Sequence, residues 1–348
     1  MPQLRKDIIS GRWVIVAAER SKRPDDFRPA QAAEAKPAEA RGFCPFCVGN
    51  ESKTPPEVYA LRAEGTKPDE PGWRVRVVPN KFPALNRGPA PARQTAGLLT
   101  WMEGVGVHEV VIENPDHDLE LADLDAGHIR AVLKVFQDRI GSIEEELHYR
   151  YVQVFKNKGK EAGASLSHPH SQIVATPIVP KRVKEEIYGA GRLFRHSKEC
   201  VFCRIIREET AAKERLVYRN DHVLVKVPFA GRFPFEMRVV PLRHEAYFSR
   251  VREEELDGLA DALKTALTRL KTVLADPPFN LIIHQAPNPA GKNHTEVDVE
   301  KAYHWHIEIL PVLTRVAGFE WGTGFYINPV APETAAQFLR VGGSGSVG

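Results

Sequence analysis

The sequence predicts an α+β fold made of two similar halves, each combining short strands with one long helix. The first observation is a series of features that occurs twice in the same order: a Cys-x-x-Cys pair, a strand, a turn ending in histidine, a long helix, a strand and a His-x-His motif. The second is the length of 348 residues, which is sufficient for two domains with cores of their own. We therefore expect an internal duplication. The expected units are an N-terminal half over 1–180, a C-terminal half over 181–340 and a flexible tail over 341–348.

In the first half, runs rich in β-branched and aromatic residues predict strands over 12–17, 73–78, 107–113 and 151–155. A helix is expected over 121–147, where helical spacing of apolar residues gives one core-facing stripe. The stripe consists of Ile129, Leu133, Phe136 and Ile140. The segments 28–41 and 87–96 are rich in Pro and Ala and are expected to be loops.

The second half is expected to follow the same plan. Strands are predicted over 216–218, 223–227 and 279–284, and a strand followed by a turn over 235–244. A run of leucines at helical spacing predicts the buried face of a long helix. Its members are Leu256, Leu259, Leu263, Leu267, Leu270 and Leu274.

Composition and charge exclude two broad classes of protein. The net charge of +3 is nearly balanced, which argues against nucleic-acid binding through an extended basic surface. No apolar run is long enough to span a bilayer, and the hydrophobic fraction of 43% is ordinary for a soluble globular protein. We expect a cytoplasmic protein that binds neither nucleic acid nor membrane.

All four cysteines fall in the two Cys-x-x-Cys pairs, which indicates metal binding in an intracellular chain; disulfides are the weaker alternative. Zinc prefers four sulfur and nitrogen ligands, so each pair requires two histidines. The expected ligand sets are Cys44, Cys47, His117 and His168, and Cys200, Cys203, His244 and His304. His108 competes as a ligand in the first set, and His196 competes with His244 in the second. The expected role of the metal is structural. A zinc-ribbon nucleic-acid binder is an alternative that neither the spacing nor the charge supports.

The segment from Ser167 to Gln172, Ser-His-Pro-His-Ser-Gln, places two imidazoles and a carboxamide on one face of an extended strand. If His168 binds metal, His170 stays free, and a neutral imidazole nitrogen is a good nucleophile toward phosphorus. Attack on the α-phosphate of a nucleotide gives nucleotidyl-His170, and a second phosphate acceptor completes a ping-pong exchange. The alternation recurs at His304-Trp305-His306-Ile307-Glu308, but the Glu308 carboxylate would repel a phosphate.

Other residues near these motifs are candidates for binding the substrate. Small residues before His168 let backbone N–H groups approach a phosphate, and Ser165 and Gln172 can hydrogen-bond its oxygens. An amide at Gln172 favours group transfer over hydrolysis, because it donates no full proton. The remaining candidates can contact phosphate, ribose or base: Arg20, Arg23, Asn80 and Phe82.

Four segments together resemble the galactose-1-phosphate uridylyltransferase family of the histidine-triad superfamily: Cys44-Pro45-Phe46-Cys47, Asn114-Pro115-Asp116-His117, Val152–Gly159 and Ser167–Gln172. The resemblance runs from Arg12 to about Glu333. It implies two histidine-triad-like halves forming antiparallel half-barrels, and a homodimer whose active sites use both subunits. It implies an enzyme of galactose metabolism that exchanges UMP between UDP-glucose and galactose 1-phosphate through uridylyl-His170. Around the nucleotide it places Gln172, Ser165, Asn157, Asn80, Arg20 and Arg23, and on the hexose phosphate Glu320 with Lys or Arg side chains.

The second cysteine pair departs from one branch of that family. Some members hold iron or zinc in the second half through a Glu and three His, which here would be Glu186, His284, His304 and His306. Those members lack the second pair, whereas two-zinc relatives that transfer adenylyl groups have it. The preferred second site is therefore the one with Cys200 and Cys203, with iron or zinc as its metal. The pair also raises the standing of an alternative function, a phosphorylase of the ADP-glucose type with the same His170 chemistry.

Overall fold

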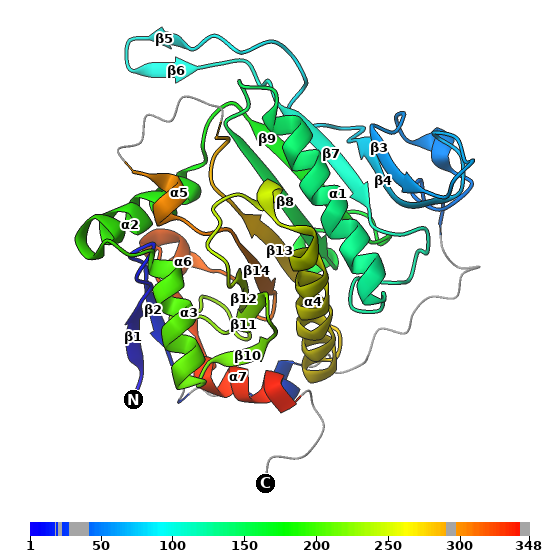
Figure 1. Ribbon diagram of the computed structural model, residues 1–348. Helices are drawn as coiled ribbons and strands as arrows, with labels where there is room; N and C mark the ends of the chain where they lie inside the picture. The colour runs from blue at the N-terminus through cyan, green and yellow to red at the C-terminus, as the bar shows by residue number, and fades with distance from the viewer. Residues whose placement is uncertain (18, 20–22, 28–41, 290–296, 342–348) are drawn as a thin grey trace.

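A ten-stranded antiparallel sheet runs through the molecule and takes five strands from each half of the chain (Figure 1). The computed structural model describes residues 1–17, 19, 23–27, 42–289 and 297–341. From the first half come β3 (Tyr59–Arg62), β4 (Trp73–Pro79), β7 (Val107–Ile112), β8 (Tyr151–Lys158) and β9 (His170–Thr176). From the second come β10 (Leu216–Arg219), β11 (Val223–Lys226), β12 (Met237–Pro241), β13 (Phe279–His284) and β14 (His306–Pro311). The order is β10-β11-β12-β14-β13-β8-β9-β7-β4-β3, so β8 and β13 join the two sets.

Two long helices, α1 (Ala126–Glu144) and α4 (Glu253–Leu274), lie side by side against one face of this sheet (Figure 1). The six leucines expected on one face of α4 are each at most 2% exposed, and so are the four stripe residues of α1. Both stripes belong to a single apolar core that also includes strand residues from both halves. The expected core-facing stripes are therefore confirmed.

Local hydrogen bonds fix where the long helices begin. The Asp125 side chain accepts a hydrogen bond from the His128 backbone N–H at 2.7 Å, so α1 begins after Asp125 rather than at Leu121 as expected. In α4, the Glu255 carboxylate accepts the Arg252 backbone N–H at 2.8 Å. Satisfying these N–H groups stabilises the first turn of each helix.

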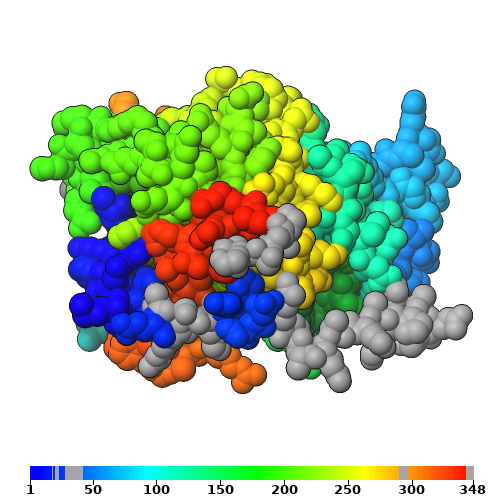
Figure 2. All heavy atoms as spheres, turned by 90° about the horizontal axis from the view of Figure 1, so that it is seen from below, coloured from blue at the N-terminus to red at the C-terminus, as the bar shows by residue number. Residues whose placement is uncertain are grey.

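The N-terminal and C-terminal segments of the described chain pack against each other. A three-stranded sheet joins β1 (Gln3–Lys6) and β2 (Trp13–Val16) to β15 (Tyr326–Asn328). Figure 2 shows N-terminal residues (blue) beside the C-terminal helix α7 (Pro332–Val341, red), and the Arg5 guanidinium pairs with Glu333 at 2.8 Å. The other α-helices and strands of the described residues are α2 (Lys181–Ser197), α3 (Val201–Ala212), α5 (Val299–Ala302), α6 (Gly318–Thr323) and the hairpin β5 (Gln94–Ala96) and β6 (Leu99–Trp101).

The α+β fold class and the paired strand-and-helix plan are confirmed. The strand expected over 12–17 forms, but it belongs to the small sheet rather than the main one. Helices α2 and α3 were not expected, and Cys203 lies on α3. The loop over 28–41 and the tail over 342–348 lie outside the described residues. The boundary between 180 and 181 stays a prediction. No helix within the described ranges combines the length and apolar character that a membrane span requires.

One buried carboxyl group makes the stability of this core depend on pH. Glu144, in the last turn of α1, is 8% exposed and accepts a hydrogen bond from the Ser249 hydroxyl at 2.8 Å. Burial raises the pKa of Glu144 to about 7 from an ordinary value of 4.5. Its protonated form therefore contributes stability that is fully present below pH 4.5 and is lost as the pH rises through about 7.

The Glu144→Gln variant is accordingly expected to be more stable than the parent at pH 8 by about 3 kcal/mol. At pH 5 the difference should shrink to about 1 kcal/mol. Urea unfolding at the two pH values measures both differences. The exposed neighbour Glu145→Gln is the control, and an equal gain at both pH values would contradict the assignment to Glu144.

Candidate active site and metal centres

A cavity of about 730 Å³ lies where β8 ends and β9 begins. His170, Asn157 and Ser165 line it, and the second half contributes Asp276 and Pro278 from the turn between α4 and β13. The loop over 159–169 forms one wall. Gly159 has a φ of +85°, and a Cβ there would lie 2.9 Å from the Cβ of Pro278. Glycine is needed at this position because any other side chain would push the two walls apart.

His170 is the first residue of β9 and is 8% exposed. Its Nδ1 lies 2.8 Å from the His168 carbonyl oxygen. Because a carbonyl can only accept, Nδ1 carries the proton, and Nε2 keeps a lone pair. Burial lowers the pKa of His170, which favours the neutral ring. The arrangement presents an uncharged nucleophilic nitrogen at the cavity.

Gln172 follows on the same face of β9 and is held by a histidine. The Ala84 backbone N–H donates to His108 Nδ1 at 3.0 Å, so Nε2 carries the proton and donates to Gln172 Oε1 at 2.8 Å. Asn80 Nδ2 lies 3.0 Å from the same His108 nitrogen. The His108 ring therefore hydrogen-bonds Gln172 and contacts Asn80, two of the residues expected at the nucleotide, a role that the sequence did not indicate.

The other residues expected to bind the substrate do not all line the cavity at His170. Asn157 accepts a hydrogen bond from Asn280 Nδ2 at 2.8 Å, while Phe82 is 83% exposed. Arg20 lies outside the described residues, and Arg23 is not among the described residues that line the cavity. Glu320 lines a second cavity of about 260 Å³ with Arg232, Arg315 and Tyr326. Within one chain, Glu320 and His170 thus belong to separate cavities.

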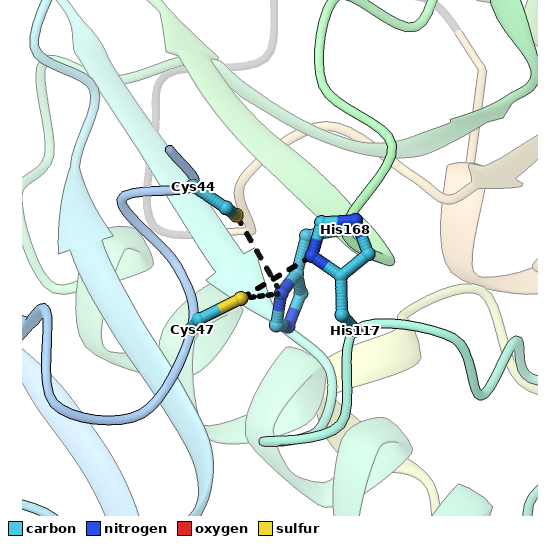
Figure 3. Close-up of side chains that lie close together, drawn as sticks. All are labelled: Cys44, Cys47, His117 and His168. Atoms are coloured by element: carbon cyan, nitrogen blue, oxygen red, sulfur yellow. Dashed lines mark hydrogen bonds between the residues drawn. The ribbon is translucent and has the colours of Figure 1, made fainter. Parts of the chain in front are cut away.

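The first candidate metal centre consists of Cys44, Cys47, His117 and His168, whose side chains point toward one another (Figure 3). Cys47 Sγ lies 3.2 Å from His117 Nδ1 and 3.7 Å from His168 Nδ1, and Cys44 Sγ lies 3.8 Å from His168 Nδ1. These distances match the edge of a tetrahedral zinc site, which is about 3.6 Å between sulfur and nitrogen ligands. His168 Nε2 donates to the Asn114 carbonyl at 2.9 Å, which orients the ring.

The second half repeats this geometry with Cys200, Cys203, His244 and His304. His244 Nδ1 lies 3.4 Å from Cys203 Sγ, and His304 Nδ1 lies 3.9 and 4.0 Å from the two sulfurs. His304 Nε2 donates to the Pro241 carbonyl at 2.9 Å, as His168 does to its own carbonyl partner. Both donor sets fit a structural metal ion with sulfur and nitrogen ligands. His196 is exposed on α2 and is not part of the set.

A third buried group contains Glu186, His284, His306 and Glu308. The structure therefore separates His304, whose Nδ1 faces the cysteines, from the set with Glu186, His284 and His306 that the resemblance offered as an alternative. His284 lies between Glu186 at 3.1 Å and Glu308 at 3.3 Å, and its ring stacks on His306. Both Arg232 and Arg238 pair with Glu308. These arginines already neutralise the carboxylate at the position that matches Gln172.

Comparisons with known proteins show which families this chain is similar to. A family model described as galactose-1-phosphate uridyl transferase, N-terminal domain, matches residues 1–180, and one described as a domain of unknown function (DUF4921) matches 127–340. An ADP-glucose phosphorylase from Arabidopsis thaliana is 36% identical over 97% of this chain and 92% of its own length. A galactose-1-phosphate uridylyltransferase from Thermotoga maritima is 32% identical over 98% of both chains.

Two solved structures are similar to this chain over all or nearly all of its length. The crystal structure of an ADP-glucose phosphorylase from Arabidopsis thaliana with bound ADP-glucose has a TM-score of 0.80 at 33% identity and covers 100% of both chains. A uridylyltransferase structure has a TM-score of 0.73 at 31% identity and covers 98% of both.

Proposed function

We propose that this chain, which belongs to the galactose-1-phosphate uridylyltransferase family, transfers a nucleotidyl group between phosphate compounds through a covalent bond to His170. The observation that carries the proposal is the hydrogen bond of 2.8 Å from His170 Nδ1 to the His168 carbonyl. It fixes one tautomer, in which the lone pair of Nε2 is available beside a cavity that also contains Ser165 and Asn157.

The chemistry follows from that tautomer. The Nε2 lone pair attacks the α-phosphorus of a sugar nucleotide, and the bond from that phosphorus to the oxygen of the β-phosphate breaks, which releases a sugar 1-phosphate. The Nδ1 proton stays on the ring throughout, held by the His168 carbonyl. A phosphate oxygen of the acceptor then attacks the same phosphorus and releases neutral imidazole. The proposed contribution of Ser165, Asn157 and Gln172 is to position the phosphate and ribose.

The proposed donor is ADP-glucose and the proposed acceptor is inorganic phosphate, so that the products are glucose 1-phosphate and ADP. The support is the similarity to the Arabidopsis ADP-glucose phosphorylase, together with the second Cys and His set. A second candidate is the exchange of UMP between UDP-glucose and galactose 1-phosphate, which the family model and the Thermotoga maritima relative favour.

We further propose one zinc ion in each Cys and His set, with a structural role. The first set joins the loop that carries Cys44 to the segment that carries His168, two residues before the nucleophile. A homodimer is also proposed: Glu320 and His170 line separate cavities within one chain, and in a dimer Glu320 of one chain would complete the site around His170 of the other.

Trapping the covalent intermediate tests the proposed function. The protein is incubated with ADP-glucose or with UDP-glucose in the absence of an acceptor, and intact mass and peptide mapping locate the adduct. We expect an adenylyl group on His170 that added phosphate removes as ADP. A uridylyl group on His170 instead would favour the second candidate, and an unmodified His170 with both donors would contradict the proposal.

A further inference from the structure

A buried lysine shares the cavity with His170 and has no part in the chemistry above. Lys156 is 1% exposed and lines the same cavity, near the end of β8. Its ammonium donates to Glu113 at 2.8 Å and pairs with Glu120 at 3.1 Å. A buried lysine is rare unless it is paired, so these carboxylates explain how it stays charged.

Glu113 in turn contacts the residues on both sides of the nucleophile. Its backbone N–H donates to the Pro169 carbonyl at 3.3 Å, and its carboxylate accepts the Ser171 hydroxyl at 2.6 Å. Ser171 also lies directly opposite Lys156 in the antiparallel pairing of β8 with β9. Glu113 therefore holds the chain immediately before and immediately after His170.

This arrangement needs the lysine because Glu113 is 0% exposed. A buried carboxylate without a counter-ion either takes up a proton or moves toward water. A Glu113 carboxylate that turned toward water would leave the Ser171 hydroxyl without its acceptor, and a protonated Glu113 could either accept from that hydroxyl or donate to it, so the contact would no longer be fixed in one arrangement. Lys156 thus maintains the acceptor that fixes the strand carrying the nucleophile.

Resting on the proposed function, we propose that Lys156 is a positioning residue: by balancing the charge of Glu113, it holds Ser171, and with it the start of β9, so that His170 Nε2 meets the α-phosphorus in line. Its ammonium acts through Glu113 rather than on the substrate. An error of about 1 Å in the position of a reacting group slows a reaction by about 100-fold.

The test compares the Lys156→Met variant with the Lys156→Met/Glu113→Gln double variant. The double variant removes both charges but keeps an amide oxygen that accepts the Ser171 hydroxyl. The matched control is Lys226→Met, which breaks another buried lysine pair, with Glu209 at 2.7 Å on β11 and α3. For each, the rate of adduct formation on His170 and the Kd of the sugar nucleotide are measured, and ¹⁵N-histidine NMR reports the His170 tautomer.

We expect Lys156→Met to slow adduct formation about 100-fold with less than about threefold change in Kd, and to mix the two His170 tautomers. The double variant should return to within about tenfold of the parent rate and restore the Nδ1–H tautomer. Lys226→Met should lose stability without either change. A parent-like rate and tautomer in Lys156→Met would overturn the proposal, and so would a folded double variant as slow as the single one. If the parent itself forms no adduct, the proposed function fails, while the tautomer comparison still decides the positioning role.

Discussion

The His170→Ala variant is expected to form no nucleotidyl adduct and to lose at least about 10⁴-fold in turnover with any sugar nucleotide. The reason is that the reaction has no other route: the nitrogen that attacks the phosphorus is the nitrogen that later leaves, so its removal abolishes both half-reactions. Metal content and fold should be retained. Among the residues that the structure describes, the His170 side chain makes one hydrogen bond, to the carbonyl of His168, and it is not a predicted metal ligand. Intact mass, a sugar 1-phosphate release assay, metal analysis and thermal unfolding measure these four expectations in turn.

His306 provides the matched control for this variant. It occupies the same place in the second half, where its Nδ1 lies 3.2 Å from the His304 carbonyl. Yet His306 is 1% exposed and stacked on His284, beside a carboxylate rather than a carboxamide. His306→Ala should therefore keep the adduct on His170. Adduct formation that survives in His170→Ala and disappears in His306→Ala would reverse the roles assigned to the two halves.

The candidate metal ligands and the proposed nucleophile could be named from the sequence because their signal is local or duplicated. Two Cys-x-x-Cys pairs and two His-x-His motifs in the same order gave both Cys and His sets, and the structure assembles both. The position of His108, the competing ligand in the first half, could not be predicted from a duplicated motif. It lies within a strand, and only the pairing of β7 with β9 brings its ring to Gln172.

The positioning residues around His170 were missed for a related reason. Lys156 stands at a core-facing position of β8, two residues after the buried Val154. The alternation of buried and less buried residues along β8 therefore predicts that this lysine is buried. A lone lysine at such a position is informative only when its partners are known. Glu113 and Glu120 come from the segment after β7, and no spacing in the sequence links them to β8. The duplicated features did not indicate α2 and α3, because α2 lies between the two series and only Cys203 on α3 belongs to one of them.

Glu308 shows how the structure changed the interpretation of a residue. The sequence indicated that its carboxylate excludes phosphate from the second half, which remains consistent with its place beside His306. The structure adds that Arg232 and Arg238 occupy that carboxylate and that His284 bridges it to Glu186. In the second half, the position that corresponds to Gln172 therefore carries a carboxylate that is engaged in ion pairs.

The Cys44→Ser and Cys200→Ser variants are each expected to lose one of two zinc ions per chain and to unfold at a temperature lower by about 10 °C. The common cause is that each set joins segments far apart in the sequence, so the metal contributes binding energy to folding. Metal analysis and thermal unfolding measure both effects. A variant that keeps the full metal content of the parent would contradict the ligand assignment for its half.

The two variants should differ in how they affect the reaction. His168 belongs to the first set, and its carbonyl accepts the Nδ1 proton of His170 at 2.8 Å. The metal and the Asn114 carbonyl each hold the His168 ring. Loss of the metal removes one of these two contacts, so the backbone carbonyl of His168, which selects the reactive tautomer of His170, is held less firmly. Cys44→Ser should therefore slow adduct formation about tenfold or more in the folded fraction. Cys200→Ser removes an equivalent metal beside His304, which holds no nucleophile, and should leave the rate per folded chain unchanged. Equal slowing per folded chain in both variants would contradict a role that is specific to the first metal, whereas slowing confined to Cys44→Ser would assign the first metal a part in orienting the nucleophile.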